Sequence, residues 1–441
     1  MNVEFRVLIV EDSAEKYQRI VALLEVRLSH ISCKFVWADE YNSAVRTLTE
    51  STFDLVVLDL LIPVAAGTVS AENSRTLLSM MQAGELTPVP HIIGLTQHSA
   101  VAETERAYYS ESLLALELFS FETEDWADRI AGKIIYLIKS KTASVQFISN
   151  NYQTDLLIVV ARYENEFKPI SEKMDWESDP SKNSPYFPTH RTLTGRMTFE
   201  GGRSLRTTLI CIGEMGIASA AVLTSQAISL LRPRIVSMLG MACGFNHERS
   251  SSPALFGDVL IARECACWEE GKYLEYGKEK ERLFRNRANI RTVDGAIAPV
   301  LSATIETASE SIVPIFATFL KSAGSRKLRE AYGESIRQTP ELKYGMVVSG
   351  SSVIADSAQI DEIIKRHPSA VGLEMELYGV FTAAQKCVGR PPGVLGIKGV
   401  ADFGDGAKHK HIQAYASILS FYTLIGILRE LYAGGRVLPV S

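Results

Sequence analysis

Three acidic residues in the second half of the sequence have the types and surroundings that acid–base chemistry needs. Asp402 ends the apolar run VLGIKGVA, Glu376 follows GLEM, and Glu166 lies shortly after the strand-like run DLLIVV. A carboxylic acid kept protonated by apolar surroundings can donate a proton to a leaving group, whereas an ionised one can activate water or accept hydrogen bonds from hydroxyls. These roles fit cleavage of the bond between a purine and its ribose, because charge then builds on both fragments.

Each acid can be given a role in that reaction, and each has an ordinary structural interpretation as well. Asp402 would protonate N7 of the leaving base, Glu376 would bind the ribose 2′ and 3′ hydroxyls, and Glu166 would orient the attacking water. Alternatively, Asp402 could cap the following helix, Glu374 and Glu376 could lie on a solvated helix face, and the ENE segment could be an exposed loop. Glu164 is the alternative to Glu166 as the base.

Ordered segments of this half resemble the phosphorylase/nucleosidase superfamily, particularly the methylthioadenosine and S-adenosylhomocysteine nucleosidases, over about residues 155–435. The segments are VVARYENEF, SMLGMACGF, VVSGSSVIAD, GLEMELYGVF and GIKGVADF. The resemblance implies hydrolysis without a cofactor, with Asp402 as the acid and Glu166 as the base. It implies that the substrate is bound by Gly240, Ala242, Ser349, Val353, Ile354, Glu374, Met375, Glu376 and Lys398. The family commonly has Ser or Cys before the acid and an aromatic residue against the base, whereas this chain has Ala401 and Val353.

A second group of acids lies in the first 140 residues. Glu11 and Asp12 follow the run VLIV, Asp59 follows LVVL, and Thr96 ends HIIGLT. Because the carboxyl ends of parallel strands meet at one edge of a sheet, we expect one pocket that could hold a hard cation such as Mg²⁺. The alternative is that Asp12 and Asp59 only cap helices.

This pattern resembles the receiver domain of response regulators over residues 4–140. The resemblance implies phosphorylation of Asp59 by a cognate histidine kinase or phosphotransfer protein, Mg²⁺ held by Glu11, Asp12 and Asp59, and a switch role for Thr96. Receivers usually have a lysine at the end of the fifth strand, but the matching segment LELFSFETEDW has none.

A receiver in front of a nucleosidase resembles the effectors of Detocs-type phage-defence systems, which remove adenine from ATP. The first expectation is therefore a receiver-regulated enzyme that hydrolyses an adenine nucleotide, ATP above all. Its alternatives are a methylthioadenosine- or S-adenosylhomocysteine-type nucleosidase or a nucleoside phosphorylase in salvage, and an inactive nucleotide-sensing module with a pseudo-receiver. Two basic groups could meet substrate phosphates, namely His190, Arg191 and Arg196, or Lys278, Lys280 and Arg282.

Two series of alternating strand-like and helical segments must position these residues. They predict an α/β chain with a flavodoxin-like (βα)5 receiver at residues 1–140, a linker at 141–154, and a three-layer αβα nucleosidase-like domain at 155–441. The linker is expected because KSKTASVQFISNNYQT is polar and rich in small residues.

Composition narrows the possible partners. The chain has 46 basic and 51 acidic residues and a net charge of −5, which favours neither a nucleic-acid nor a membrane partner. Its six cysteines are scattered, as is typical of reduced thiols, and the sequence offers no run of ~20 apolar residues for a membrane span. A cytoplasmic homo-oligomer is expected.

Overall fold

A computed structural model describes residues 4–433 apart from short gaps at 65–66, 87–89, 110–114, 180–182, 200–201, 203, 246–252, 277–280, 296, 308–311 and 407–408. The chain forms two compact units, Met1–Phe147 and Ile148–Ser441. Helix α5 (Asp125–Asn150) continues through most of the segment 141–154 that the sequence pattern marks as a linker. The small polar residues there do not stop the helix, because Ala, Ser, Lys and Gln are all tolerated in a helix interior.

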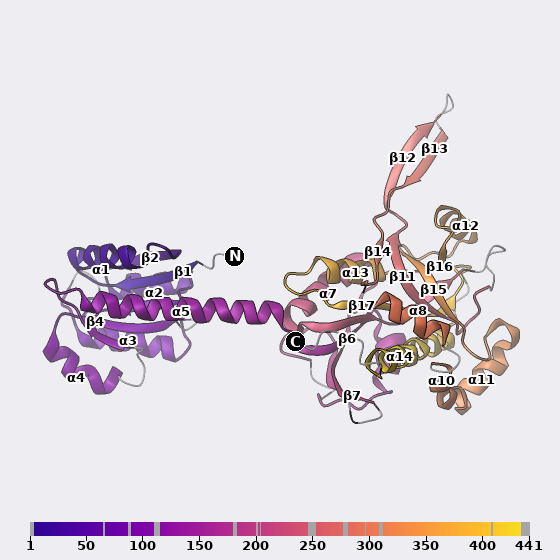
Figure 1. Ribbon diagram of the computed structural model, residues 1–441, viewed down its shortest axis with the longest axis horizontal. Helices are drawn as coiled ribbons and strands as arrows, with labels where there is room; N and C mark the ends of the chain where they lie inside the picture. Colours follow the sequence, from indigo (N-terminus) through magenta and orange to yellow (C-terminus); the bar gives the residue numbers. More distant parts are fainter. Residues whose placement is uncertain are drawn as a thin grey trace. The chain divides into compact units, whose positions relative to one another are not determined.

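The first unit is a five-stranded parallel sheet with helices between the strands (Figure 1). The order β2-β1-β3-β4-β5 is the doubly wound flavodoxin-like order that the alternation in the sequence predicts. Its elements are β1 (Phe5–Val10), α1 (Ala14–Arg27), β2 (Cys33–Ala38), α2 (Tyr41–Glu50), β3 (Leu55–Leu58), α3 (Ala71–Gln82), β4 (His91–Thr96), α4 (Ser99–Tyr109), β5 (Ala115–Leu118) and α5.

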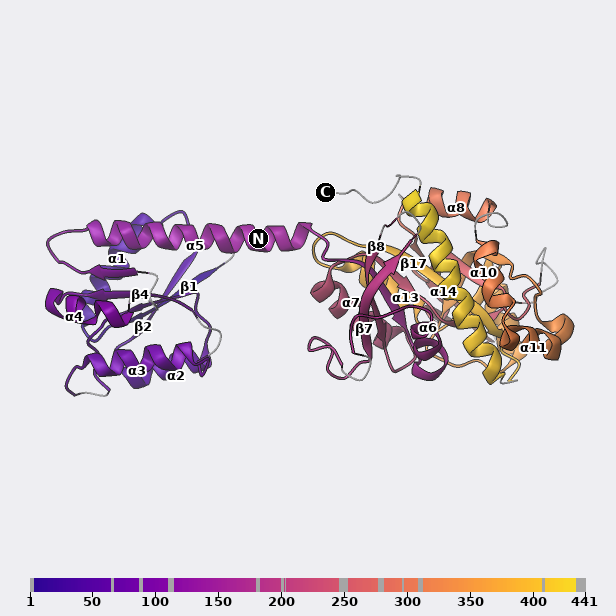
Figure 2. The same cartoon turned by 90° about the horizontal axis from the view of Figure 1, so that it is seen from below.

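Alternate residues of β1 build the two cores of this unit. Val7 and Ile9 belong to the cluster that contains the buried side chains of α1 and α5, whereas Leu8 and Val10 belong to the cluster under α2 and α3. Figure 2 shows the same arrangement, with α1 and α5 on one face of the sheet and α2 and α3 on the other. A strand buried on both faces is therefore continuously apolar, as FRVLIV nearly is.

The second unit is built on a ten-stranded mixed sheet in the order β14-β11-β15-β16-β10-β17-β9-β6-β8-β7. Its elements are β6 (Thr154–Val160), the π-helix η1 (Tyr163–Phe167), α6 (Lys168–Ser171), β7 (Thr192–Thr198), β8 (Ser204–Cys211), α7 (Ile217–Leu231), β9 (Pro233–Met238), β10 (Met241–Gly244), β11 (Val259–Cys267), β12 (Gly271–Tyr276), β13 (Glu281–Asn286), β14 (Arg291–Thr292), α8 (Ala298–Glu306), α10 (Val313–Leu320), α11 (Ala323–Tyr332), the 3₁₀-helix η2 (Gly333–Ser335), β15 (Leu342–Ser349), α12 (Ser357–Arg366), β16 (Ala370–Glu374), α13 (Leu377–Lys386), β17 (Gly393–Asp402) and α14 (Lys410–Ala433).

Helices cover both faces of this sheet, as the three-layer expectation requires. Helices α7 and α13 pack on one face, and α14 packs on β17 from the other (Figure 1). One feature departs from a simple open sheet. Strand β11 also pairs with β17 in an antiparallel sense, so β11, β15, β16, β10 and β17 close into a ring. The hairpin β12–β13 forms a separate two-stranded sheet.

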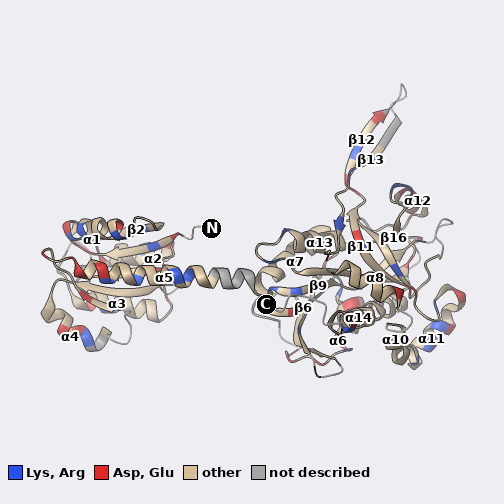
Figure 3. Ribbon diagram, viewed as in Figure 1, with Lys and Arg blue, Asp and Glu red and all other residues tan. Residues whose placement is uncertain are grey.

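Helix α14 is the one described helix that is long and apolar enough to cross a membrane, over His411–Tyr432. Because 72% of its window is buried inside the unit, it has the character of a core helix. Basic and acidic positions are interspersed along the ribbon of both units (Figure 3).

Candidate functional site

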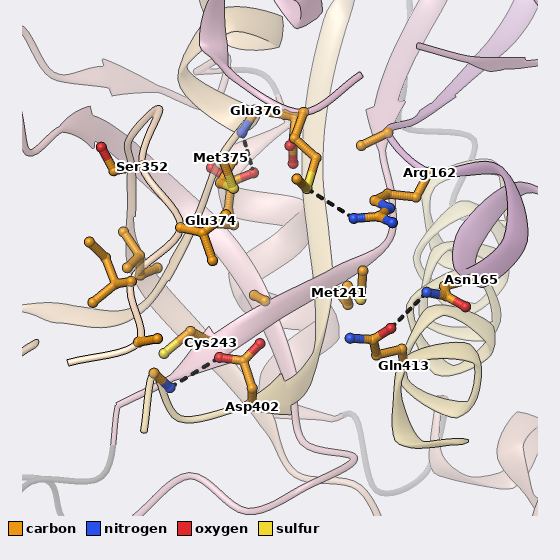
Figure 4. A pocket seen from close by; sticks show the side chains of 18 of the residues that line it. Arg162, Asn165, Met241, Cys243, Ser352, Glu374, Met375, Glu376, Asp402 and Gln413 are labelled. Atoms are coloured by element: carbon orange, nitrogen blue, oxygen red, sulfur yellow. Dashed lines mark hydrogen bonds between the residues drawn. The ribbon is translucent and has the colours of Figure 1, made fainter. Parts of the chain in front are cut away.

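A cavity of about 390 Å³ lies in the second unit, a size typical of small-molecule sites (Figure 4). It joins acids and small or apolar residues that the sequence places far apart. Of the residues predicted to act in it, the lining includes Glu166, Ala242, Val353, Ile354, Glu374, Met375, Glu376 and Asp402.

Asp402 is the last residue of β17 and faces the cavity. The amide N–H of Gly404 donates to its Oδ1 at 3.1 Å. A register shift between Ala242 and Cys243 of β10 places Cys243 opposite Asp402. Burial raises the pKa of Asp402 above its ordinary value, although the Gly404 N–H and Cys243 act in the opposite direction. The site therefore favours the protonated acid to a higher pH than an ordinary Asp would allow.

Glu166 is buried and is held by three backbone N–H groups. Ala161 and Arg162 donate to its Oε2 at 2.7 and 2.8 Å, and Met241 donates to its Oε1 at 3.1 Å. Burial raises the pKa of Glu166, whereas the charge of Lys398 lowers it. Since the donors fix both oxygens, the carboxylate has one orientation toward the cavity.

The π-helix η1 is what brings Glu166 to this position. Its wider turn closes on a hydrogen bond from Phe167 N–H to Arg162 O at 2.9 Å, and π-turns of this kind often mark functional sites. Glu164, the alternative base, is exposed instead and lies 3.8 Å from Lys168. The geometry therefore favours Glu166 over Glu164.

Gly240 does not line the cavity but makes room for Glu166. Its φ is +134°, in the region that favours glycine, and a Cβ atom there would overlap the carboxylate of Glu166. The lack of a side chain at Gly240 thus leaves room for the carboxylate of Glu166, whereas the sequence had suggested close approach of a ligand.

Glu376 is buried at the start of α13 and has two partners. Lys398 Nζ lies 3.0 Å from its Oε2, and the Gly216 N–H at the N-terminus of α7 donates to its Oε1 at 3.3 Å. Both contacts hold the carboxylate in place at the cavity wall, where its oxygens could accept hydrogen bonds from hydroxyls.

Glu374 is held mainly as a structural cap of α13. Its carboxylate accepts from the N–H groups of Glu376 and Leu377, and Ser349 Oγ donates to it at 2.5 Å. Burial raises the pKa of Glu374 to about 7, while Lys398 at 3.5 Å acts to lower it. Ser349 and Lys398 are themselves fully buried behind the wall and are outside the lining.

Sequence reasoning missed several residues of the cavity wall. Arg162, Asn165 and Gln413 are part of the lining, and Asn165 Nδ2 donates to Gln413 Oε1 at 2.7 Å (Figure 4). Arg162 lies just after the end of β6 and just before η1, so its position in the chain was an available signal. Among the described residues of the basic groups expected to meet phosphates, none is in the lining. Lys278 and Lys280 lie outside the described residues.

In the first unit, Glu11, Asp12 and Asp59 each offer an oxygen, and these oxygens lie within 4.8 Å of one another. Glu11 and Asp59 are buried and Asp12 is exposed. Thr96, the last residue of β4, is fully buried. This oxygen set suits a hard divalent cation, so the residues present fit Mg²⁺.

Lys16 was missed and lies within this pocket. Its ammonium is 2.7 Å from Glu11 Oε2 and 2.5 Å from Asp59 Oδ2, and the side chain is only 2% exposed. The available signal was its spacing, because a residue in the first turn of a helix can point back toward the preceding strand end. Burial raises the pKa of Glu11 to about 8, although Lys16 acts to lower it.

Comparisons with known proteins assign the second unit to a protein family. The sequence model of the phosphorylase superfamily matches residues 156–421. The chain is 24% identical over 429 residues to the uncharacterized protein y4jS of Sinorhizobium fredii, covering 94% of this chain and 96% of that protein. It is 26% identical over 212 residues to the ATP nucleosidase Cap17 of Escherichia coli, covering 46% of this chain but only 37% of Cap17.

Two further similarities involve nucleosidases. The 5′-methylthioadenosine/S-adenosylhomocysteine nucleosidase of Haemophilus influenzae is 22% identical over 218 residues, which cover 49% of this chain and 78% of that protein. Among solved structures, the corresponding enzyme of Helicobacter pylori has a TM-score of 0.42 at 14% identity and covers 64% of this chain and 100% of that one.

Proposed function

Because the chain belongs to the phosphorylase superfamily, we propose that its second unit hydrolyses the N-glycosidic bond of an adenine nucleotide or nucleoside, with ATP as the first candidate. The observation that carries the proposal is the meeting of Asp402, Glu166 and Glu376 around one cavity. They supply an acid, a base and a hydroxyl-binding carboxylate, which are the groups that the reaction requires.

In the proposed reaction, the bond between C1′ of the ribose and N9 of adenine breaks, and its electron pair leaves with the base. Asp402 donates a proton to N7, so that the base departs neutral. Glu166 accepts a proton from the water whose oxygen bonds to C1′. Glu376 holds the 2′ and 3′ hydroxyls while positive charge develops on the sugar. Proton exchange with solvent then restores both acids.

Glu166 also supports hydrolysis over phosphorolysis. A buried carboxylate beside the attacking position can deprotonate water, whereas it would repel a phosphate anion. Phosphorolysis would require a cation at that position, and the buried Lys398 is paired with Glu376.

Arg162 supports a substrate with a charged 5′ group. Figure 4 shows Asp402 and Glu376 on opposite sides of the cavity, with the guanidinium of Arg162 to one side of the line between them. A nucleoside placed with its base on Asp402 and its hydroxyls on Glu376 would direct its 5′ carbon toward Arg162, where phosphate could be bound. The similarity to an ATP nucleosidase points the same way.

A substrate panel tests the proposal. Purified protein would be incubated with ATP, AMP, adenosine and methylthioadenosine, with and without inorganic phosphate, and free adenine would be measured by chromatography. Release from ATP without phosphate is expected. Preferred release from methylthioadenosine would assign a salvage-type nucleosidase, and a phosphate requirement would assign a phosphorylase. Binding without release from any of them would identify a nucleotide sensor and reject the enzyme.

We propose further that the first unit is a receiver that regulates this activity through Asp59, with Thr96 as its switch hydroxyl and a histidine kinase or phosphotransfer protein as the donor. Glu11, Asp12 and Asp59 would hold Mg²⁺, which would neutralise charge during phosphoryl transfer. The expected setting, anti-phage defence, rests on the resemblance to Detocs-type effectors. Adenine release that is unchanged by a phosphodonor, in both the wild type and Asp59→Asn, would reject the regulation.

A further inference from the structure

Lys16 is an unusual residue for its position. It lies in the first turn of α1, where the helix dipole disfavours a positive charge, and lysine is seldom fully buried. Nevertheless its side chain is 2% exposed, and its ammonium contacts Glu11 Oε2, Asp59 Oδ2 and, at 3.4 Å, the carbonyl of Leu95. All three donors of the ammonium are therefore directed into the acidic pocket. Helix stability does not account for this placement. We therefore attribute it to the contacts of the ammonium with the acidic pocket.

The end of the fifth strand shows a complementary change. Phe119 follows β5, its N–H donates to Thr96 O at 2.9 Å, and its side chain is buried. The Lys16 ammonium lies 5.4 Å from the centre of the Phe119 ring, a distance suited to a cation–π contact. An aromatic ring thus occupies the strand end, and the cation that faces Asp59 comes from α1 instead.

We propose that Lys16 is the residue that binds the phosphoryl group when Asp59 is phosphorylated, in place of a lysine on the fifth strand. The inference rests on the proposed receiver function of the first unit. Phosphorylation adds negative charge to a site that already has three carboxylates, and a buried ammonium next to the acceptor oxygen offsets that charge. The bond to Leu95 O is the longest of its three contacts, so this donor is the one best placed to turn to a phosphoryl oxygen.

Acetyl phosphate with Mg²⁺ provides a defined test. The phosphoryl group would move to Asp59 as the P–O bond of the donor breaks and acetate leaves with the electron pair. Intact-mass spectrometry would follow labelling in the full chain, with Asp59→Asn as the blank. Lys16→Met should be labelled about ten- to a hundredfold more slowly than the wild type, the range expected when a hydrogen bond to a charged group is lost. Lys139→Met, on the exposed side of α5, is the matched control and should behave as wild type.

A relocated lysine separates phosphoryl binding from a merely structural role. The double variant Lys16→Met/Phe119→Lys returns the cation to the strand end and should regain most of the labelling rate, and Lys16→Arg should retain part of it. If Lys16→Met does not fold, as judged by thermal melting, these two variants decide the question. Wild-type labelling of folded Lys16→Met would overturn the inference. So would a relocated variant that melts normally and labels no faster than Lys16→Met.

The possible failures can be told apart. If the wild type takes no phosphoryl group, the receiver proposal fails and this inference fails with it, whatever the adenine assay shows. If the wild type is labelled and Lys16 proves indifferent, only this inference fails.

Discussion

Lys398 Nζ lies 3.0 Å from Glu376 Oε2 and 3.5 Å from Glu374 Oε2, and all three side chains are almost completely buried. The ammonium of Lys398 lies immediately behind the cavity wall and offsets the charge of two carboxylates in the lining. Burial of an unpaired charge is costly, so the arrangement depends on Lys398. It holds the carboxylate of Glu376 where the ribose hydroxyls are expected to bind.

Removal of that ammonium is expected to destabilise the second unit. Lys398→Met should lower the free energy of unfolding by about 3–5 kcal/mol, since two buried carboxylates lose their partner. Denaturant unfolding would measure it, with Lys365→Met on the exposed face of α12 as the control. Lys398→Met/Glu376→Gln should recover part of the stability without recovering adenine release. Equal stability of Lys398→Met and Lys365→Met would contradict this account.

Asp402→Asn keeps the shape of the side chain and removes the acid. Adenine release should fall by about 10²–10⁴-fold, the usual contribution of general acid catalysis. Thermal melting should change little, because the Gly404 N–H can still donate to the amide oxygen. Full activity in this variant would move the acid to another residue.

The pH dependence of kcat/KM follows from the two raised pKa values. Asp402 must be protonated, so activity should fall as pH rises through its pKa, and burial shifts this fall to a higher pH than for an ordinary Asp. Glu166 must be ionised, so activity should also fall as pH drops through its pKa. The residual activity of Asp402→Asn should lack the alkaline fall. An unchanged alkaline fall in that variant would assign it to another group.

Gly240→Ala tests the packing around Glu166. A Cβ atom would overlap the carboxylate in a backbone conformation that favours glycine, so Glu166 should be displaced and kcat should drop by about a hundredfold. The control is Gly324→Ala, where a Cβ meets nothing within 4 Å. Steady-state kinetics on both variants would decide, and a normal kcat in Gly240→Ala would count against Glu166 as the base.

Arg162→Met addresses the 5′ end of the substrate. With ATP, kcat/KM should fall about ten- to a hundredfold, whereas with adenosine it should stay nearly constant, because only ATP offers phosphate to the guanidinium. Arg191→Met is a matched control, since Arg191 lies over the neighbouring Tyr163 ring but outside the cavity lining. Equal losses on both substrates would exclude phosphate binding by Arg162.

Local patterns in the sequence predicted the α/β class and which acids face one cavity. Short apolar runs mark strands, and residues just after them fall at strand ends, so Asp402 and Asp59 could be located from the sequence alone. The register between strands that are far apart in the sequence could not be predicted in this way. Cys243 faces Asp402 only because β10 carries a bulge, and β11 meets β17 across more than a hundred residues of chain.

The neighbourhood of Glu166 shows a different limit of prediction from the sequence. The sequence alone left Glu164 and Glu166 as alternative bases. In the structure, the wide turn of η1 buries Glu166 and leaves Glu164 exposed, which a helix-period pattern does not reveal. The position of Lys16 in the acidic pocket could not be predicted for a similar reason, because it depends on a side chain that turns back over the helix N-terminus.

The ring of strands around β17 should restrict the movement of this strand. β17 pairs with β9 over Gly393–Gly396, with β11 over Ile397–Gly399 and with β10 over Gly399–Asp402, so its amides should be among the slowest to exchange with deuterium. The opposite wall around Val353 is outside any strand or helix, and Val353 itself is 65% exposed. Asp402 thus ends a strand that is paired along its whole length, and in the proposed reaction the adjustment that would admit a nucleotide and release adenine falls to the wall around Val353.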